Sequence, residues 1–175
     1  MAEKKLFWYP LRVFFGRADL VRRTFDEADL ESFYPMRLVE KPTKEGLRFV
    51  EEPLVRSLMF VKTDPETLRE LRVKLHGTIA TYHDRVAQGP LVVPEKQMDQ
   101  FKELCQLKDS GLEYLGDDQP KYHTGDRVRV IEGIFKGFEG HIKRIRHDRR
   151  LIVTVEGVAA FATRFIPPSC LEKIE

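Results

Sequence analysis

Residues 125–142 read GDRVRVIEGIFKGFEGHI, and this stretch decides the fold of the C-terminal part of the chain. Apolar and charged residues alternate at 127–130, which predicts a strand with one buried face. Gly133, Gly137 and Gly140 permit backbone angles that side chains forbid, so the pattern is strand, tight turn and strand. No Gly-Lys-Ser or Gly-Lys-Thr follows these glycines, and a phosphate-binding P-loop is therefore excluded.

Short apolar segments continue beyond this stretch. Ile142, the segment 151–155 and Ile166 are separated by turn residues, which predicts about five short strands curled into a small β-barrel. We expect Phe135 and Phe138 to close one end of this barrel.

The N-terminal part predicts a small sheet covered by helices, which is an α+β arrangement. Strands are expected over residues 6–15, 32–36, 54–61 and 78–83. Helices are expected to begin at Arg17, at Asp64-Pro65 and at Pro94. The charged segment 41–51 contains proline and glycine and is expected to be a mobile hairpin loop. Pro10 removes a ladder donor, so the first strand is expected at an edge of the sheet or bulged.

Apolar residues spaced by three and four mark the buried side of each predicted helix. These residues are Ala18, Val21, Phe25 and Ala28 in the first helix, Leu68 and Leu71 in the second, and Met98, Phe101 and Leu104 in the third.

Composition and charge narrow the class of protein. The 175 residues carry 30 Lys+Arg and 28 Asp+Glu, a net charge of +2, so the whole chain is not a polycation. Cys105 and Cys170 form no C-x-x-C pair, which excludes a zinc ribbon and a thioredoxin-like site. No stretch resembles a signal peptide or a membrane span, and we therefore expect a cytoplasmic protein.

The charge balance changes along the chain. It is −2 over residues 1–119 and +4 over residues 120–175. The polar, Gly/Pro-marked stretch at 108–120 lies where the balance changes and is expected to be a linker between two domains.

The stretch 125–142 closely resembles the KOW motif of the NusG, ribosomal-protein and elongation-factor families, with Gly125, Gly133, Gly137 and Gly140 as its glycines. Segments 8–17, 34–36, 52–61 and 89–94 resemble, in the correct order, the NusG N-terminal (NGN) domain. The tail 161–174 looks most like the UpxY-type paralogues of the NusG family, which act as antiterminators on long polysaccharide operons.

This resemblance implies an NGN domain of antiparallel sheet and helices over residues 1–107, a linker over 108–121, and a small all-β, SH3-like KOW barrel over 122–175. The implied function is a transcription elongation and antitermination factor that acts as a monomer, without cofactor, metal or membrane. It is not expected to be an enzyme, because no nucleophile or metal-ligand spacing surrounds its histidines.

The resemblance also implies an apolar depression that binds the clamp coiled coil of RNA polymerase. Its expected members are Arg12, Leu54, Val55, Leu58, Phe60 and Tyr82. Strand alternation puts Leu54, Leu58 and Phe60 on one face of the strand and Val55 on the other. A buried core role is the competing interpretation for Leu58 and Phe60.

Basic residues form two expected nucleic-acid surfaces. The first resembles the region where some paralogues touch non-template DNA, and it consists of Arg17, Arg22, Arg23, Lys74 and His76. The second is a hairpin tip that nascent RNA or a ribosomal protein could bind, and it consists of Lys143, Arg144, Arg146, Arg149 and Arg150. A solvated helix face, with Arg22 and Arg23 paired to Asp26 and Glu27, is an equally good interpretation of the first.

Two rival functions stay open. One is a general NusG factor that couples polymerase to Rho or to the ribosome through the KOW domain. The other is an RNA- or ribosome-binding KOW module without polymerase contact.

Overall fold

The computed structural model describes residues 2–174, which divide into two compact units. The first unit contains the residues up to Pro35 together with Val55–Met98. The second contains Met36–Leu54 together with the residues from Asp99 onward. This division differs from the predicted domains, because the segment 36–54 and most of the third helix group with the barrel. The boundaries 1–107, 108–121 and 122–175 therefore stay a proposal.

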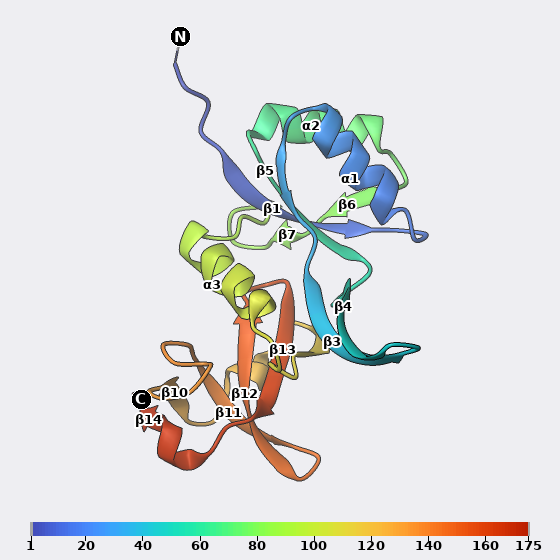
Figure 1. The fold of residues 1–175 in the computed structure, drawn as a ribbon. Coiled ribbons are helices and arrows are strands. Elements are labelled where there is room, and N and C mark those ends of the chain that lie inside the picture. Colours follow the sequence, from blue (N-terminus) through green and yellow to red (C-terminus); the bar gives the residue numbers. More distant parts are fainter. Residues whose placement is uncertain (1, 175) are drawn as a thin grey trace. The chain divides into compact units, whose positions relative to one another are not determined.

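The first unit is built on a four-stranded antiparallel sheet in the order β2-β5-β1-β6 (Figure 1). The strands are β1 (Phe7–Val13), β2 (Glu31–Phe33), β5 (Leu58–Thr63) and β6 (Ile79–Thr81), followed by the short pair β7 (His83–Asp84) and β8 (Gly89–Pro90). Helices α1 (Ala18–Glu27) and α2 (Pro65–Lys74) cover one face of this sheet (Figure 1).

The predicted inward residues of the two helices meet the strands in one apolar cluster. Ala18, Val21 and Phe25 of α1 and Leu68 and Leu71 of α2 are all buried in it, as the spacing predicted. Ala28 does not join them, because α1 has already ended and Ala28 is its exposed C-terminal cap.

Helix α2 begins at Pro65 for a local reason. The carboxylate of Asp64 accepts hydrogen bonds from the backbone N–H and the hydroxyl of Thr67, at 3.0 and 2.7 Å. This cap satisfies a backbone donor of the first turn, and Pro65 has no N–H that would need a partner.

Strand β1 lies inside the sheet, between β5 and β6, so the prediction of an edge or bulged strand is wrong. Pro10 is opposite Phe60 of β5, whereas the pairing with β6 begins only at Leu11. Phe14, on the same side of the strand as Pro10, donates its N–H toward Thr78. Pro10 is therefore tolerated because its missing N–H faces a position that β6 does not reach.

The segment expected to be a mobile hairpin loop is part of a hairpin of two paired strands. Strands β3 (Met36–Thr43) and β4 (Gly46–Pro53) pair along their whole length, from Met36 opposite Pro53 to Thr43 opposite Gly46. The expected hairpin over 41–51 is therefore confirmed, but most of it is strand rather than loop, because cross-strand pairing and a tight turn next to Gly46, with φ of +114°, outweigh the polar composition.

The rest of the second unit is the barrel and α3 (Glu95–Gln106), whose C-terminal part belongs to this unit. Six strands run in the order β14-β10-β11-β12-β13-β9. They are β9 (Glu113–Asp117), β10 (Arg127–Val130), β11 (Glu139–Ile145), β12 (Asp148–Val155), β13 (Ala159–Phe165) and β14 (Leu171–Lys173). Two 3-10 turns, Pro120–His123 and Pro168–Cys170, join them.

The predicted inward residues of α3 are correct, since Met98, Phe101 and Leu104 are all buried. Phe135 and Phe138 are buried in the barrel unit as well. The segment 108–121, expected to be a linker, contains strand β9, which pairs with β13. No helix within residues 2–174 has the length and apolar character that crossing a membrane requires.

Candidate functional site

One face of the four-stranded sheet gathers most of the residues expected to bind polymerase. Arg12 of β1 lies directly opposite Leu58 of β5 and Ala80 of β6. Phe60 lies two positions beyond Leu58 in the same strand, so these side chains share the face that points away from α1 and α2.

An arginine–aromatic contact marks the partly exposed part of this face. The Arg12 guanidinium lies over the ring of Tyr82, 5.2 Å from its centroid, and both residues are partly exposed. Two further members were missed by the sequence analysis. Phe33 of β2 contacts Phe60 with ring centroids 6.2 Å apart, and Trp8 alternates along β1 onto the same side as Arg12.

Burial divides the expected polymerase-binding set. Leu58 and Phe60 are 1% and 0% exposed, and Leu54 and Val55 are also buried. A partner helix would therefore reach Leu58 and Phe60 only after the side chains covering them separate. Arg12 and Tyr82 need no such change.

The expected alternation does not extend to Leu54 and Val55. Strand β5 begins only at Leu58, and a turn precedes it in which the Leu58 N–H donates to the Val55 carbonyl at 3.2 Å. Because period-two alternation holds only within a strand, Leu54 and Val55 cannot be assigned to faces of the sheet by counting from Leu58.

A basic cavity lies at the end of α2. It has a volume of about 620 Å³ and is lined by Arg69, Arg72, Val73, His76, Gly77, Ile79 and Ala80. His76 was expected in a nucleic-acid surface, whereas Arg69 and Arg72 were missed. Their signal was available, because Arg69, Arg72 and His76 follow a spacing of three and four. Lys74 is exposed on the same helix but does not line the cavity.

The arginines around α1 are exposed. Arg17 occupies the N-terminal cap position, and its side chain makes no capping hydrogen bond. The Arg22 guanidinium lies over the ring of Tyr34, 5.7 Å from its centroid. Within residues 2–174, neither Arg22 nor Arg23 forms an ion pair with Asp26 or Glu27, so the alternative pairing along the helix is absent from this structure.

The basic hairpin of the barrel consists of strands β11 and β12 and the turn between them. Arg144 lies directly opposite Arg149, and Lys143 lies opposite Arg150. Like charges directly opposite each other are unfavourable, and a bound polyanion would relieve that repulsion. Arg144 and Arg149 are exposed.

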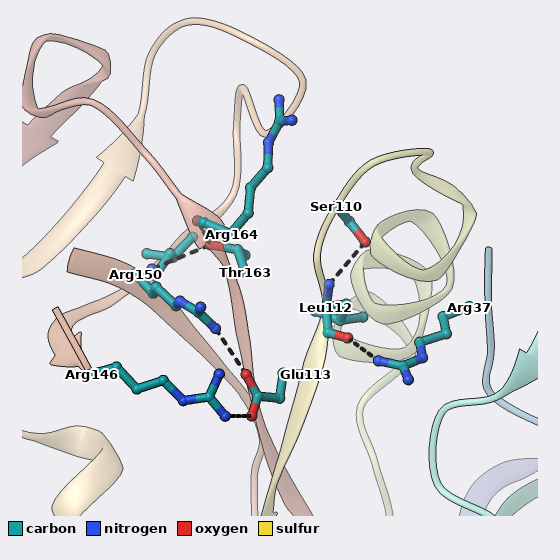
Figure 2. Close-up of polar contacts among 9 residues, drawn as sticks. Arg37, Ser110, Leu112, Glu113, Arg146, Arg150, Thr163 and Arg164 are labelled. Atoms are coloured by element: carbon teal, nitrogen blue, oxygen red, sulfur yellow. Dashed lines mark hydrogen bonds and ion pairs between the residues drawn. The ribbon is translucent and has the colours of Figure 1, made fainter. Parts of the chain in front are cut away.

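Three members of this basic hairpin already have partners. The Lys143 ammonium donates to the Thr124 hydroxyl at 2.6 Å. The Arg150 guanidinium lies 2.8 Å from one Glu113 oxygen, and Arg146 lies 3.6 Å from the other (Figure 2). Lys143 keeps its charge, because a hydroxyl does not neutralise it, and a single carboxylate serves both Arg146 and Arg150. The tip therefore stays positive, with Arg144 and Arg149 as exposed members.

The glycines of the 125–142 stretch serve two different purposes. Gly125, Gly133 and Gly137 have φ of +95°, +88° and +96°, which favours glycine. Gly140 does not have a positive φ. It was expected to allow backbone angles that side chains forbid, and that reason is wrong. A Cβ on Gly140 would lie only 2.2 Å from the Ile152 carbonyl oxygen, because β11 and β12 approach closely there.

The groups described here with shifted pKa values have structural rather than catalytic roles. Hydrogen bonds from Lys41 and then Arg37 hold the pKa of Glu52 below its usual value. Burial raises the pKa of the Cys105 thiol to about 12, which makes it a poor nucleophile. In the described part of the chain, no three His, Cys, Asp or Glu side chains gather as metal ligands.

Comparison with known proteins agrees with the two halves of this description. Residues 124–156 match the family model of the KOW motif. The whole fold is similar to a solved structure described as "Domain interaction in Thermotoga maritima NusG", with a TM-score of 0.50, 20% sequence identity, and 98% of each chain covered. The chain therefore has a NusG-like α+β fold that carries a KOW motif.

Proposed function

We propose that this chain is a NusG-family transcription elongation factor that binds RNA polymerase and suppresses pausing or termination. The observation that carries the proposal is the pairing of a NusG-like fold over 98% of the chain with a KOW motif at residues 124–156. The protein would act in the cytoplasm as a binding factor rather than as an enzyme.

The proposed polymerase contact is the sheet face that contains Arg12, Leu58, Phe60 and Tyr82, with Leu54 and Val55 beside the start of β5. A helix of the polymerase clamp would dock on it through apolar anchors. Because Leu58 and Phe60 are buried, docking begins at the partly exposed Arg12–Tyr82 pair and exposes the apolar residues afterwards.

Clamp binding accounts for antitermination in mechanical terms. A factor that joins the two sides of the polymerase cleft disfavours clamp opening, so the enzyme spends less time paused and passes terminators. The resemblance of segment 161–174 to UpxY-type paralogues supports action on long polysaccharide operons. A location of the gene at the head of such an operon would separate this role from that of a general NusG factor, and a Rho-dependent release assay would do so independently.

The decisive experiment is readthrough of a terminator by purified RNA polymerase with the full chain added. Leu58→Asp tests the apolar centre, but it places a charge in a buried position and can unfold the sheet. Arg12→Glu and Tyr82→Ala change partly exposed residues instead, and both should reduce readthrough and co-purification with core polymerase.

Matched controls keep this test specific. Arg85→Glu and Val86→Ala change exposed residues of the same unit outside the proposed face, and both should behave as the unchanged protein. Full readthrough with folded Arg12→Glu and Tyr82→Ala variants would contradict the proposed face. Absence of any polymerase binding by the unchanged chain would contradict the function itself.

Two basic surfaces are proposed to assist this function through contacts of their own. Arg17, Arg22, Arg23, Lys74 and His76, together with Arg69 and Arg72 of the cavity, would contact phosphates of non-template DNA. Such contacts supply affinity without sequence readout and weaken as salt rises.

The basic hairpin supports a second candidate, binding of nascent RNA or of a ribosomal protein by the barrel. The opposed Arg144 and Arg149 carry this candidate. A variant with Arg144→Glu and Arg149→Glu should bind RNA more weakly, and its slope of log affinity against log salt should fall by about 1.4 for two lost phosphate contacts. Lys136→Glu, an exposed basic residue elsewhere in the barrel, is the matched control. No RNA affinity at low salt would exclude the RNA candidate.

A further inference from the structure

Strand β9 lies at one end of the strand order of the barrel unit. The strands β14, β10, β11, β12 and β13 pair in an unbroken order, and β9 pairs only with β13. Without β9, β13 would be an edge strand. A long apolar edge is a template for pairing with another chain, and natural proteins cover such edges.

The covered edge is unusually apolar. Ala159, Ala160, Phe161 and Ala162 of β13 are each at most 1% exposed. They lie opposite Asp117, Gly116, Tyr114 and Glu113 of β9. Backbone pairing supplies the affinity of such an edge for a strand, and alternate side chains supply the specificity.

Strand β9 is irregular where it pairs with β13. Its register against β13 shifts between Ala160 and Phe161, so the ladder is interrupted. Gly116 lies inside the strand with φ of +116°, and glycine weakens a strand interior. Tyr114 is 37% exposed. A short, bulged strand therefore covers an apolar one.

Two side chains of β9, Glu113 and Tyr114, make specific contacts with neighbouring strands. Glu113 bridges two arginines of the basic hairpin, with Arg150 at 2.8 Å and Arg146 at 3.6 Å (Figure 2). The ring of Tyr114 packs on Phe161 with centroids 5.8 Å apart. The Arg150 Nε is buried without a hydrogen-bond partner, so loss of Glu113 would leave this guanidinium with still fewer acceptors.

The segment before β9 is anchored by hydrogen bonds to two carbonyls, one on each side of Gly111. The Arg164 N–H donates to the Ser110 carbonyl at 2.8 Å. The Arg37 guanidinium donates to the Leu112 carbonyl at 3.0 Å (Figure 2). Between these two anchors, Gly111 has φ of +59°, and a Cβ there would lie 2.8 Å from the Arg164 Cβ. Any other residue at 111 would push the segment away from β13.

We propose that β9 is a displaceable internal occupant of the β13 edge, and that this edge binds an extended segment of a partner protein. The partner segment carries an acidic side chain followed by an aromatic one, as Glu113 and Tyr114 do. The acid faces Arg146 and Arg150, and the aromatic ring packs on Phe161. This inference goes beyond the proposed function and does not depend on polymerase binding.

A peptide exchange experiment on the full chain tests the proposal. The probe is a fluorescent peptide with the sequence of residues 110–119, SGLEYLGDDQ. In the unchanged protein the tethered β9 outcompetes it, because the tether raises its effective concentration. Gly111→Ala places the clash in the chain but not in the peptide, so this variant should bind the peptide about tenfold more tightly or better.

The controls separate edge exchange from general loosening. Gly46→Ala also places an alanine at a positive φ, of +114°, but with no atom within 4 Å of the added Cβ, and it should bind the peptide no better than the unchanged chain. Glu113→Gln in the chain weakens β9 without a steric clash, so it should also gain affinity and serves if Gly111→Ala does not fold. A peptide with lysine in place of its glutamate should bind more weakly to both variants.

Four results would overturn the proposal. One is failure of both variants to capture the peptide, and another is equal capture by Gly46→Ala. A concentration-dependent dimer of Gly111→Ala without peptide capture would assign the edge to a second copy of the chain. A gain of affinity for an RNA oligonucleotide without peptide capture would assign it to nucleic acid.

Discussion

Phe101 of α3 stacks on Phe161 of β13, with ring centroids 4.9 Å apart and planes inclined by 30°. Phe101 was recognisable as an inward residue of a helix and Phe161 as part of a strand, but nothing in their local sequence paired them. Both are at most 1% exposed, so this pair joins the helix to the barrel in the second unit.

We expect Phe101→Ala to lower the free energy of unfolding of the second unit by about 3–5 kcal/mol, because it removes a large buried ring and leaves a cavity. Urea denaturation followed by circular dichroism measures the change. Phe165→Ala makes the same substitution in β13 at a side that is 47% exposed, and it should cost clearly less. Equal losses from the two variants would contradict a specific role for the stacked pair.

Gly140→Ala should destabilise the barrel by about 1–3 kcal/mol, since its Cβ would meet the Ile152 carbonyl oxygen of the neighbouring strand. The shift in thermal midpoint measures this loss. Gly89→Ala is the matched control, because Gly89 also lacks a positive φ and has no atom within 4 Å of the added Cβ. A Gly140→Ala protein as stable as this control would show that β11 and β12 can separate without cost.

Asp64→Ala should destabilise α2 by about 0.5–2 kcal/mol at neutral pH through loss of the helix cap. Hydrogen bonds from the Thr67 hydroxyl and then the Thr67 N–H lower the pKa of Asp64 in the folded state. Its contribution is therefore complete above the unfolded pKa and is lost as the pH falls through the lowered folded pKa. The difference between the two proteins in urea midpoint should shrink below about pH 4.

Glu70→Ala provides the comparison for this cap. Glu70 is exposed in the same helix, so its loss should change stability little at any pH. If the Asp64→Ala difference persisted unchanged into acid, the carboxylate form of Asp64 would not be the stabilising species.

Cys105 should resist alkylation in the folded protein, because burial raises its pKa to about 12 and keeps the thiolate scarce. Mass mapping after brief iodoacetamide treatment at mildly alkaline pH should find Cys170, which is partly exposed, modified first. Both thiols should react once the chain is unfolded in urea. Rapid native modification of Cys105 would mean that α3 opens readily.

Local periodicity predicted the helices whose buried residues recur at a spacing of three and four. The spacing of Leu68 and Leu71, and of Met98 and Phe101, identified the buried sides of α2 and α3 correctly. The Asp64-Pro65 start of α2 was equally local, because the cap and the missing N–H act within one turn. The positive φ of Gly133 and Gly137 followed from the same short-range logic.

The errors of the sequence analysis fall where pairing between distant segments decides the structure. Strands β3 and β4 lie in a polar stretch that was not predicted as strand, and β9 lies within the segment predicted as a linker. Pro10 occupies an inner strand because its neighbour β6 is too short to reach it. A polar strand gives no clear periodic signal when its partner supplies the apolar side.

By itself, the sequence determined the α+β class, the KOW stretch, the helix starts and all of the predicted inward helix residues except Ala28, because each of these depends on neighbours within a turn or a strand. Only the tertiary structure decided that Arg12 lies over Tyr82, that Leu58 and Phe60 are buried, and that Glu113 bridges Arg146 and Arg150. These are contacts between segments far apart in the chain, and their geometry depends on how strands pair and what covers them. No local pattern encodes that information.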